Sequence, residues 1–149
     1  MSKPLRTISL WQPWASLIAL GEKHYETRHW STDVRSVIAI HAAKRWTAEE
    51  ARLCQQPYFR DALSRAYGSA FVQAMPLGAV LCIAHLVDVY PITTKFMATL
   101  SAQERAFGSY APGRWAWEIK VLKVFDPPIP AKGAQNWWPW TPPEGALDT

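Results

Sequence analysis

Cysteine is scarce in this chain, and long apolar runs are absent. Only Cys54 and Cys82 occur among the 149 residues, which is too few for a disulfide scaffold or a four-cysteine zinc site. No stretch of about 18 apolar residues is present that would span a membrane. The N-terminal sequence MSKPLRTISL also lacks the apolar segment of a signal peptide. We therefore expect a soluble, cytoplasmic protein with no membrane association.

The sequence signatures of several enzyme classes are missing as well. The four histidines, at positions 24, 29, 41 and 85, show no metal-ligand spacing such as HExxH. Neither a G-x-S-x-G nucleophile motif nor a glycine-rich phosphate loop occurs, and Cys82 lies within an apolar run. We expect neither a metal ion nor another cofactor.

Tryptophan is abundant, and positive charge is in modest excess. The chain has nine tryptophans, 49% hydrophobic and 19% charged residues, and a net charge of +4. This composition supports a substantial core and excludes extensive disorder, while the positive balance mildly favours polyanionic partners. The length fits one domain, for which we expect a core over about residues 7–140 and a flexible tail over residues 141–149.

The hydrophobic patterns predict an α+β fold. Strands are predicted at residues 7–10, 24–30, 37–42, 78–90 and 115–125. Helical segments are predicted after Pro13, after a capping box at Thr47, over residues 58–67, and over 102–107 after a second capping box. A phase slip near Leu122 indicates a bulge, and the prolines beyond Asp126 argue against further regular structure. The simplest arrangement is a small mixed β-barrel with two to three helices packed around it.

The densest group of polar residues is GEKHYETR at residues 21–28. On a strand over residues 24–30, the side chains of His24, Glu26, Arg28 and Trp30 share one face, and Thr27 lies on the other. A face with this many charges is costly to bury unpaired. It is either a solvated strand face with an internal Glu26–Arg28 ion pair, or a polar cleft in which these two side chains recognise the edge of a ligand.

Further candidates lie near two other element ends. His41 ends an apolar strand, where a single histidine is more often structural, and the following Lys44 and Arg45 suit a phosphate. Gln12 and Trp14 flank the start of the first predicted helix, where free N–H groups attract anions and an indole offers a base a stacking surface. The Trp-rich segment at residues 137–140 is expected to cap the open end of the core.

The order of these motifs resembles that of ASCH (activating signal cointegrator homology) domains. The resemblance covers roughly residues 7–140, nearly the whole chain. Its motifs are SLWQPWASL at residues 9–17, G-x-K-x-x-E-T-R-x-W at 21–30, IHAAK at 40–44, LGAV at 77–80, GRWAW at 113–117 and PIPAKG at 128–133.

This resemblance implies a PUA-like β-barrel with a cleft beside the first helix and the Gly-x-Lys strand, and a role in RNA binding or RNA modification. One enzymatic branch of the family hydrolyses the amide of acetylated cytidine with a lysine, a threonine and a glutamate, and another is linked to RNA cleavage. Lys23 matches that lysine and Glu104 that glutamate. The position of the threonine is taken by Glu26, with Thr27 beside it.

Three hypotheses of function follow, and the oligomeric state stays open. The first is binding of single-stranded RNA or a nucleotide, with Glu26 and Arg28 on a polar base edge. Its other contacts would be phosphates at Lys44, Arg45 and Arg114, and a base stacked on Trp14 or Trp115. The second is an amidohydrolase or ribonuclease in which a desolvated Lys23 acts as base and Glu26 or Glu104 shuttles the proton. The third is a protein-interaction adaptor that uses the Trp-rich tail.

Overall fold

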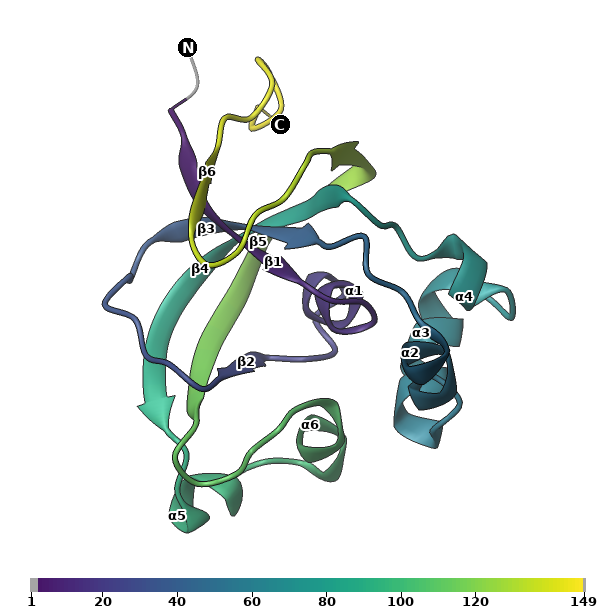
Figure 1. Ribbon diagram of the computed structural model, residues 1–149, viewed down its shortest axis with the longest axis vertical. Helices are drawn as coiled ribbons and strands as arrows, with labels where there is room; N and C mark the ends of the chain where they lie inside the picture. Colours follow the sequence, from purple (N-terminus) through teal and green to yellow (C-terminus); the bar gives the residue numbers. More distant parts are fainter. Residues whose placement is uncertain (1–2, 149) are drawn as a thin grey trace.

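A six-stranded mixed sheet forms the frame of the protein, which the computed structural model describes over residues 3–148. The strands lie in the order β2-β5-β4-β3-β1-β6 (Figure 1). Only β1 and β3 pair in parallel, and every other neighbouring pair is antiparallel. The strands are β1 Leu5–Leu10, β2 Tyr25–Arg28, β3 Val37–Ala42, β4 Ala79–Pro91, β5 Trp115–Pro130 and β6 Trp138–Trp140.

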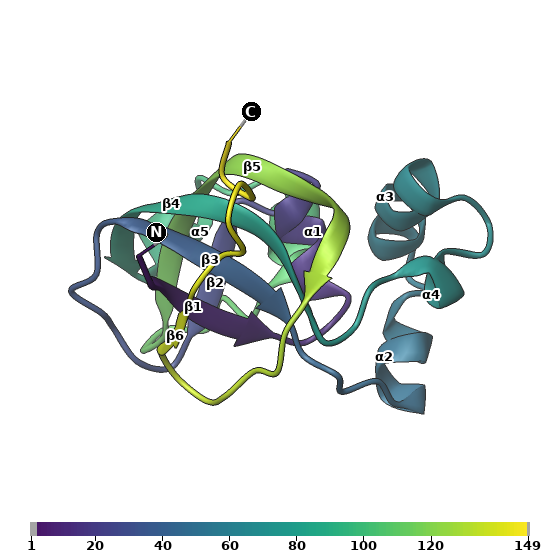
Figure 2. The ribbon, with the colours of Figure 1, turned by 90° about the horizontal axis from the view of Figure 1, so that it is seen from above.

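Short helices fill the connections between the strands. Helix α1 packs against β1, β3, β4 and β5, whereas α2, α3 and α4 form a separate group beside the sheet (Figure 2). Helices α5 and α6 lie in the connection between β4 and β5 (Figure 1). The helices are α1 Trp14–Ala19, α2 Ala48–Leu53, α3 Pro57–Tyr67, α4 Phe71–Ala74, α5 Thr94–Met97 and α6 Ala102–Phe107.

The α+β class is confirmed, but the expected barrel is corrected to an open sheet. Within residues 3–148, β2 and β6 are the two edges of the sheet and do not pair with each other. Closure requires the first and last strands to meet along enough residues to form a ladder, and these two strands span only four and three residues. Six helices are described, against the two to three expected around the sheet. The sequence pattern gave no sign of α4 and α5, because helices of four residues are too short to show a helical period.

The proline-rich end was wrongly expected to lack regular structure. Strand β5 continues through Pro127 and Pro128 to Pro130, and Pro139 lies inside β6. Proline is tolerated where its missing N–H would face away from a partner strand. The last part of β5 pairs with β4 alone, since β2 reaches only residues 115–118, and β6 is an edge strand paired with β1 alone.

Two local signals in the sequence predicted structure correctly. Ser101 caps α6, because its Oγ accepts a hydrogen bond from the backbone N–H of Glu104 at 3.0 Å, and the helix spans the predicted residues 102–107. In β5, Val121 pairs with Ala84 and Lys123 with Ile83, so the intervening Leu122 is the extra residue of a bulge.

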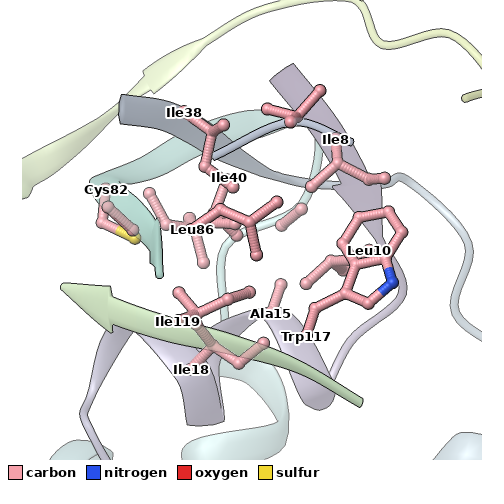
Figure 3. Close-up of a cluster of buried hydrophobic side chains, with 14 of the residues drawn as sticks. Ile8, Leu10, Ala15, Ile18, Ile38, Ile40, Cys82, Leu86, Trp117 and Ile119 are labelled. Carbon is pink, nitrogen blue, oxygen red and sulfur yellow. The ribbon is translucent and has the colours of Figure 1, made fainter. Parts of the chain in front are cut away.

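The main core lies between the sheet and α1 (Figure 3). Alternate residues of β1 and β3 face Ala15 and Ile18 of α1 and the fully buried Trp117 of β5. Trp137 stacks on Trp117 with ring centroids 5.6 Å apart. Trp140 is 8% exposed and packs edge to face on Phe125. The C-terminal tryptophans therefore close the core, as the sequence suggested.

Candidate functional site

A hollow of about 460 Å³, here called the cleft, opens between α1, β2 and the segment that follows α6. The ends of β1, β2 and α6, the start of α1 and one residue each of α2 and α3 contribute to its wall. Its charged lining residues are Lys23, Glu26, Arg28 and Arg114. Its volume falls within the range of small-molecule sites.

Lys23 lies on the floor of the cleft because the turn after α1 carries it inward. Gly21 adopts a left-handed conformation (φ 76°), and the backbone N–H groups of Glu22 and Lys23 both donate to the carbonyl of Leu17. The Lys23 side chain is almost fully buried, and its Nζ donates a hydrogen bond to the carbonyl of Tyr25. Burial lowers the pKa of Lys23, and the neighbouring carboxylates of Glu26 and Glu104 oppose part of that shift.

Glu26 lies between two cations. Its Oε1 is 3.9 Å from Nζ of Lys23, and its Oε2 is 3.0 Å from Nε of Arg28. The second contact lacks hydrogen-bond geometry, so the buried Nε of Arg28 has no hydrogen-bond partner among the described residues. Arg28 instead donates from Nη2 to the carbonyl of Ser9 at 3.3 Å, and its guanidinium lies over Trp117 and Trp30. The expected Glu26–Arg28 pair thus exists, and it lines the cleft.

The opposite wall follows the segment after α6. Arg114 donates from Nη2 to the carbonyl of Thr27 at 3.2 Å and from Nε to the carbonyl of Ser109 at 3.1 Å. The backbone N–H of Ser109 in turn donates to Oγ1 of Thr27 at 3.2 Å. Gly108 permits this approach, because a Cβ there would lie 2.7 Å from the ring of Tyr110. These hydrogen bonds hold Thr27 and Arg114 in position at the wall of the cleft.

Aromatic side chains form the remaining wall. Trp14 is half-buried at the start of α1, and Trp11 is 51% exposed immediately before it. The guanidinium of Arg45 lies 4.1 Å from the ring centre of Trp11 and covers one of its faces. Phe59 of α3 completes the apolar side of the cleft. One side of the cleft is therefore aromatic and the other carries charge.

The match to a known family decides what kind of domain this is. The family model described as the ASCH domain matches residues 8–129. The chain belongs to the ASCH domain family. This family is generally proposed to bind RNA, and its fold is PUA-like.

Comparisons with solved structures and with curated proteins add little beyond the family. A crystal structure of ASCH from Zymomonas mobilis has a TM-score of 0.45 and 20% identity, covering 84% of this chain and 72% of that one. A crystal structure of a tyrosine-to-phenylalanine mutant of the Zymomonas mobilis protein has a TM-score of 0.45 and 19% identity, with coverages of 84% and 74%. No curated protein matches this chain in sequence.

In this ASCH domain, the carboxylate of Glu104 makes its hydrogen bonds outside the cleft. Its Oε1 accepts hydrogen bonds from the backbone N–H of His24 at 2.9 Å and from Nδ1 of His24 at 3.1 Å. Its Oε2 accepts from the hydroxyl of Tyr110 at 2.9 Å. Burial, followed by the negative charge of Glu104, raises the pKa of Tyr110. Glu104 is not among the residues that line the cleft.

Two of the expected ligand-binding residues, Gln12 and His41, are buried and hydrogen-bonded within the protein. Gln12 is fully buried, and its amide bonds to Ser16 and to the carbonyl of Pro76 at 2.8 Å. His41 is 2% exposed, with Nδ1 2.9 Å from Oγ of Ser9 and Nε2 2.8 Å from the carbonyl of Ala131. Burial lowers the pKa of His41. Every polar atom of these two side chains therefore has a hydrogen-bond partner within the protein.

The other expected contacts are spread around the cleft. Lys44 is exposed in a neighbouring hollow. Arg45 is engaged by Glu50 at 3.1 Å and by Glu49 at 3.6 Å, besides Trp11. Trp115 packs against the main core and is not among the residues that line the cleft.

The prediction of the site missed several residues that line the cleft. Thr27, Ser109 and Phe59 all line it, although none was a candidate for ligand contact. Thr27 was placed on the far face of its strand, and only the return of the chain after α6 brings Ser109 against it. The hydrophobic pattern around Phe59 predicted a helix, but nothing in the sequence indicated that Phe59 would line the cleft.

No metal or membrane feature emerges from residues 3–148. They contain no group of three or more histidine, cysteine or acidic side chains arranged to hold a metal ion. Burial raises the pKa of the Cys82 thiol to about 12 and that of Cys54 to about 11. None of the helices described above has the length and apolar character needed to cross a membrane.

Proposed function

We propose that this ASCH domain binds single-stranded RNA or a nucleotide in the cleft, with one base held between the aromatic wall and the charged floor. The observation that carries the proposal is the joint placement of Trp14, Glu26 and Arg28 around one hollow that is large enough for a nucleobase. The family assignment supports the same class of ligand.

The chemistry of each wall suits one part of a nucleotide. The π-face of Trp14 would stack on a base, and such a stack contributes roughly 1–3 kcal/mol. A carboxylate oxygen of Glu26 would accept a hydrogen bond from an amino or imide N–H of the base edge, while Arg28 would donate to a ring carbonyl. Arg114 would attract the phosphate. The ligand would then be recognised by stacking, by base edge and by charge together.

Binding of a short single-stranded RNA to variants of the cleft tests the proposal. We expect Trp14→Leu to weaken binding about tenfold, the lower part of the range for a lost base stack, and Arg28→Gln to weaken it as well. Tyr58→Ala is the matched control, because Tyr58 is 44% exposed on α3 and does not line the cleft.

Two results would overturn the proposal. One is RNA affinity that is unchanged in both cleft variants while their circular dichroism spectra show the native fold. The other is affinity that does not fall between low and moderate salt, because phosphate contacts release counterions and make binding salt-dependent.

A second candidate function, hydrolysis of an acylated nucleoside, is favoured by the environment of Lys23. A lysine with a lowered pKa beside a carboxylate is suited to act as a general base. Neutral Lys23 would take a proton from water as the hydroxide attacks the amide carbon, and the leaving amine would receive that proton. The products are a carboxylic acid and the free base.

Incubation with N4-acetylcytidine distinguishes the two functions. Release of acetate and cytidine that is lost in Lys23→Met would support the hydrolase. If the wild type releases no acetate, or if Lys23→Met still releases it, Lys23 is not a catalytic base. Binding would then remain as the proposed function of the cleft.

A further inference from the structure

A second hollow, here called the groove, adjoins the cleft. It has a volume of about 1100 Å³ and shares Ser9, Trp11, Arg28 and His29 with the cleft. From these shared residues it runs between the loop after β3 and the segment 130–136 that precedes β6. The two hollows are thus continuous, with Trp11 and Arg28 at their junction.

The groove is positively charged and carries no acidic side chain among its lining residues. Arg28, Lys44 and Lys132 supply its cationic groups. Lys44 and Lys132 are exposed, and neither makes an ion pair or a side-chain hydrogen bond within residues 3–148. The smaller hollow on the other side of Trp11 differs, because Glu49 and Glu50 neutralise Arg45 there.

The floor of the groove is held in place by buried hydrogen bonds. His41 connects Oγ of Ser9 to the carbonyl of Ala131, and the same Oγ accepts a hydrogen bond from the indole N–H of Trp138 at 3.0 Å. A Cβ at Gly133 would lie 2.6 Å from both His41 and Ser9, so the loop rests directly on the sheet at this glycine. Hydrogen bonds and close packing therefore hold this part of the groove lining, residues 131–133, against the sheet.

The position of Lys44 is defined in a similar way. Gly78 adopts a left-handed conformation (φ 64°), and a Cβ there would lie 2.9 Å from Cε of Lys44. The lysine stem therefore lies along the backbone at Gly78 and leaves its ammonium group at the groove. A cation held in this way loses less side-chain freedom when it binds an anion.

We propose that the groove binds the phosphodiester backbone next to the base held in the cleft, so that the ligand is a single-stranded oligonucleotide and not a free nucleoside or mononucleotide. This inference rests on the proposed function of the cleft. The cleft has room for one base, whereas the groove is more than twice as large and offers cations without carboxylates, which is the environment a chain of phosphates requires. Arg28, at the junction, would touch both parts of the strand.

The test compares a mononucleotide with a single-stranded RNA hexamer on the wild-type protein and on two double variants. Lys44→Gln with Lys132→Gln removes the two groove cations. Lys95→Gln with Lys120→Gln is the control, because it removes the same charge from exposed positions that line none of the three hollows described here.

We expect the groove variant to bind the hexamer about tenfold more weakly and the mononucleotide as the wild type does. The plot of log K against log salt for the hexamer should become shallower by about 1.4, since each phosphate contact on a single strand contributes about 0.7. The control variant should keep a slope close to that of the wild type.

The inference about the groove fails if the mononucleotide binds as tightly as the hexamer, or if the groove and control variants weaken the hexamer equally. In both cases base binding in the cleft survives. If the wild-type protein binds neither ligand, the proposed function itself fails, so the two failures are distinguishable.

Discussion

Glu104 holds His24 through two hydrogen bonds to the same carboxylate oxygen, one from the main-chain N–H and one from the imidazole ring. His24 immediately follows Lys23 and precedes β2. The contact therefore fixes α6 against the point at which the chain enters the floor of the cleft. The hydroxyl of Tyr110 occupies the other oxygen. We infer that Glu104 positions the segment that carries Lys23 and leads into β2, which carries Glu26.

Glu104→Gln should destabilise the protein. The amide keeps one acceptor oxygen but places an NH₂ group where either Tyr110 or His24 needs an acceptor, and an unsatisfied buried polar group costs about 1–3 kcal/mol. The free energy of unfolding, measured with urea, checks this. The exposed Glu144→Gln is the control. Unchanged stability together with lost N4-acetylcytidine hydrolysis would instead make Glu104 catalytic.

Lys23→Met should leave the protein as stable as the wild type, or more stable, at neutral pH. The pKa of Lys23 is lowered in the folded state, so keeping it protonated there is unfavourable at any pH below that pKa. As the pH rises from the folded pKa towards the ordinary value of 10.5, the wild type releases this proton and the variant's advantage shrinks. Melting temperatures of both proteins between pH 7 and 10.5 measure the difference. A variant that is much less stable at pH 7 would contradict this account.

Acid should loosen the groove through His41. Its pKa is lowered on folding, so the unfolded chain takes up the proton first, and stability is lost as the pH falls through about 6.5. His41→Asn should be less stable at pH 7.5 but should show a shallower loss between pH 7 and 5. His29→Gln, which changes an exposed histidine, should keep the wild-type slope. Equal slopes in all three proteins would exclude His41 as the source.

Two tryptophans should give opposite results on substitution. Trp140→Ala removes a buried indole from β6 and should cost about 3–5 kcal/mol of stability. Trp11→Ala removes an exposed indole and should change stability little while weakening RNA binding. Chemical unfolding and RNA titration of both variants check the contrast. If a folded Trp140→Ala variant no longer binds a protein that the wild type binds, this result would support the adaptor hypothesis.

Local signals predicted the elements better than they predicted the assembly of the site. The capping residue Ser101 and the phase slip at Leu122 act within a few residues, so α6 and the bulge of β5 were visible in the sequence. Whether the sheet closes could not be predicted from the sequence, because closure depends on the lengths of the two edge strands. The internal hydrogen bonds of Gln12 and His41 could not be predicted either, because their partners, the carbonyls of Pro76 and Ala131, lie 64 and 90 residues away. Backbone acceptors so distant in the chain leave no mark in the side-chain pattern.

Strand β2 is an edge of the sheet, but its carbonyls that point away from β5 already accept hydrogen bonds from side chains. Lys23 donates to the carbonyl of Tyr25 and Arg114 to that of Thr27. An uncapped edge would invite a strand of another molecule to dock and begin aggregation. Two of the three cationic side chains that line the cleft therefore also satisfy the carbonyls of this edge, so a strand of another molecule would find fewer free acceptors there.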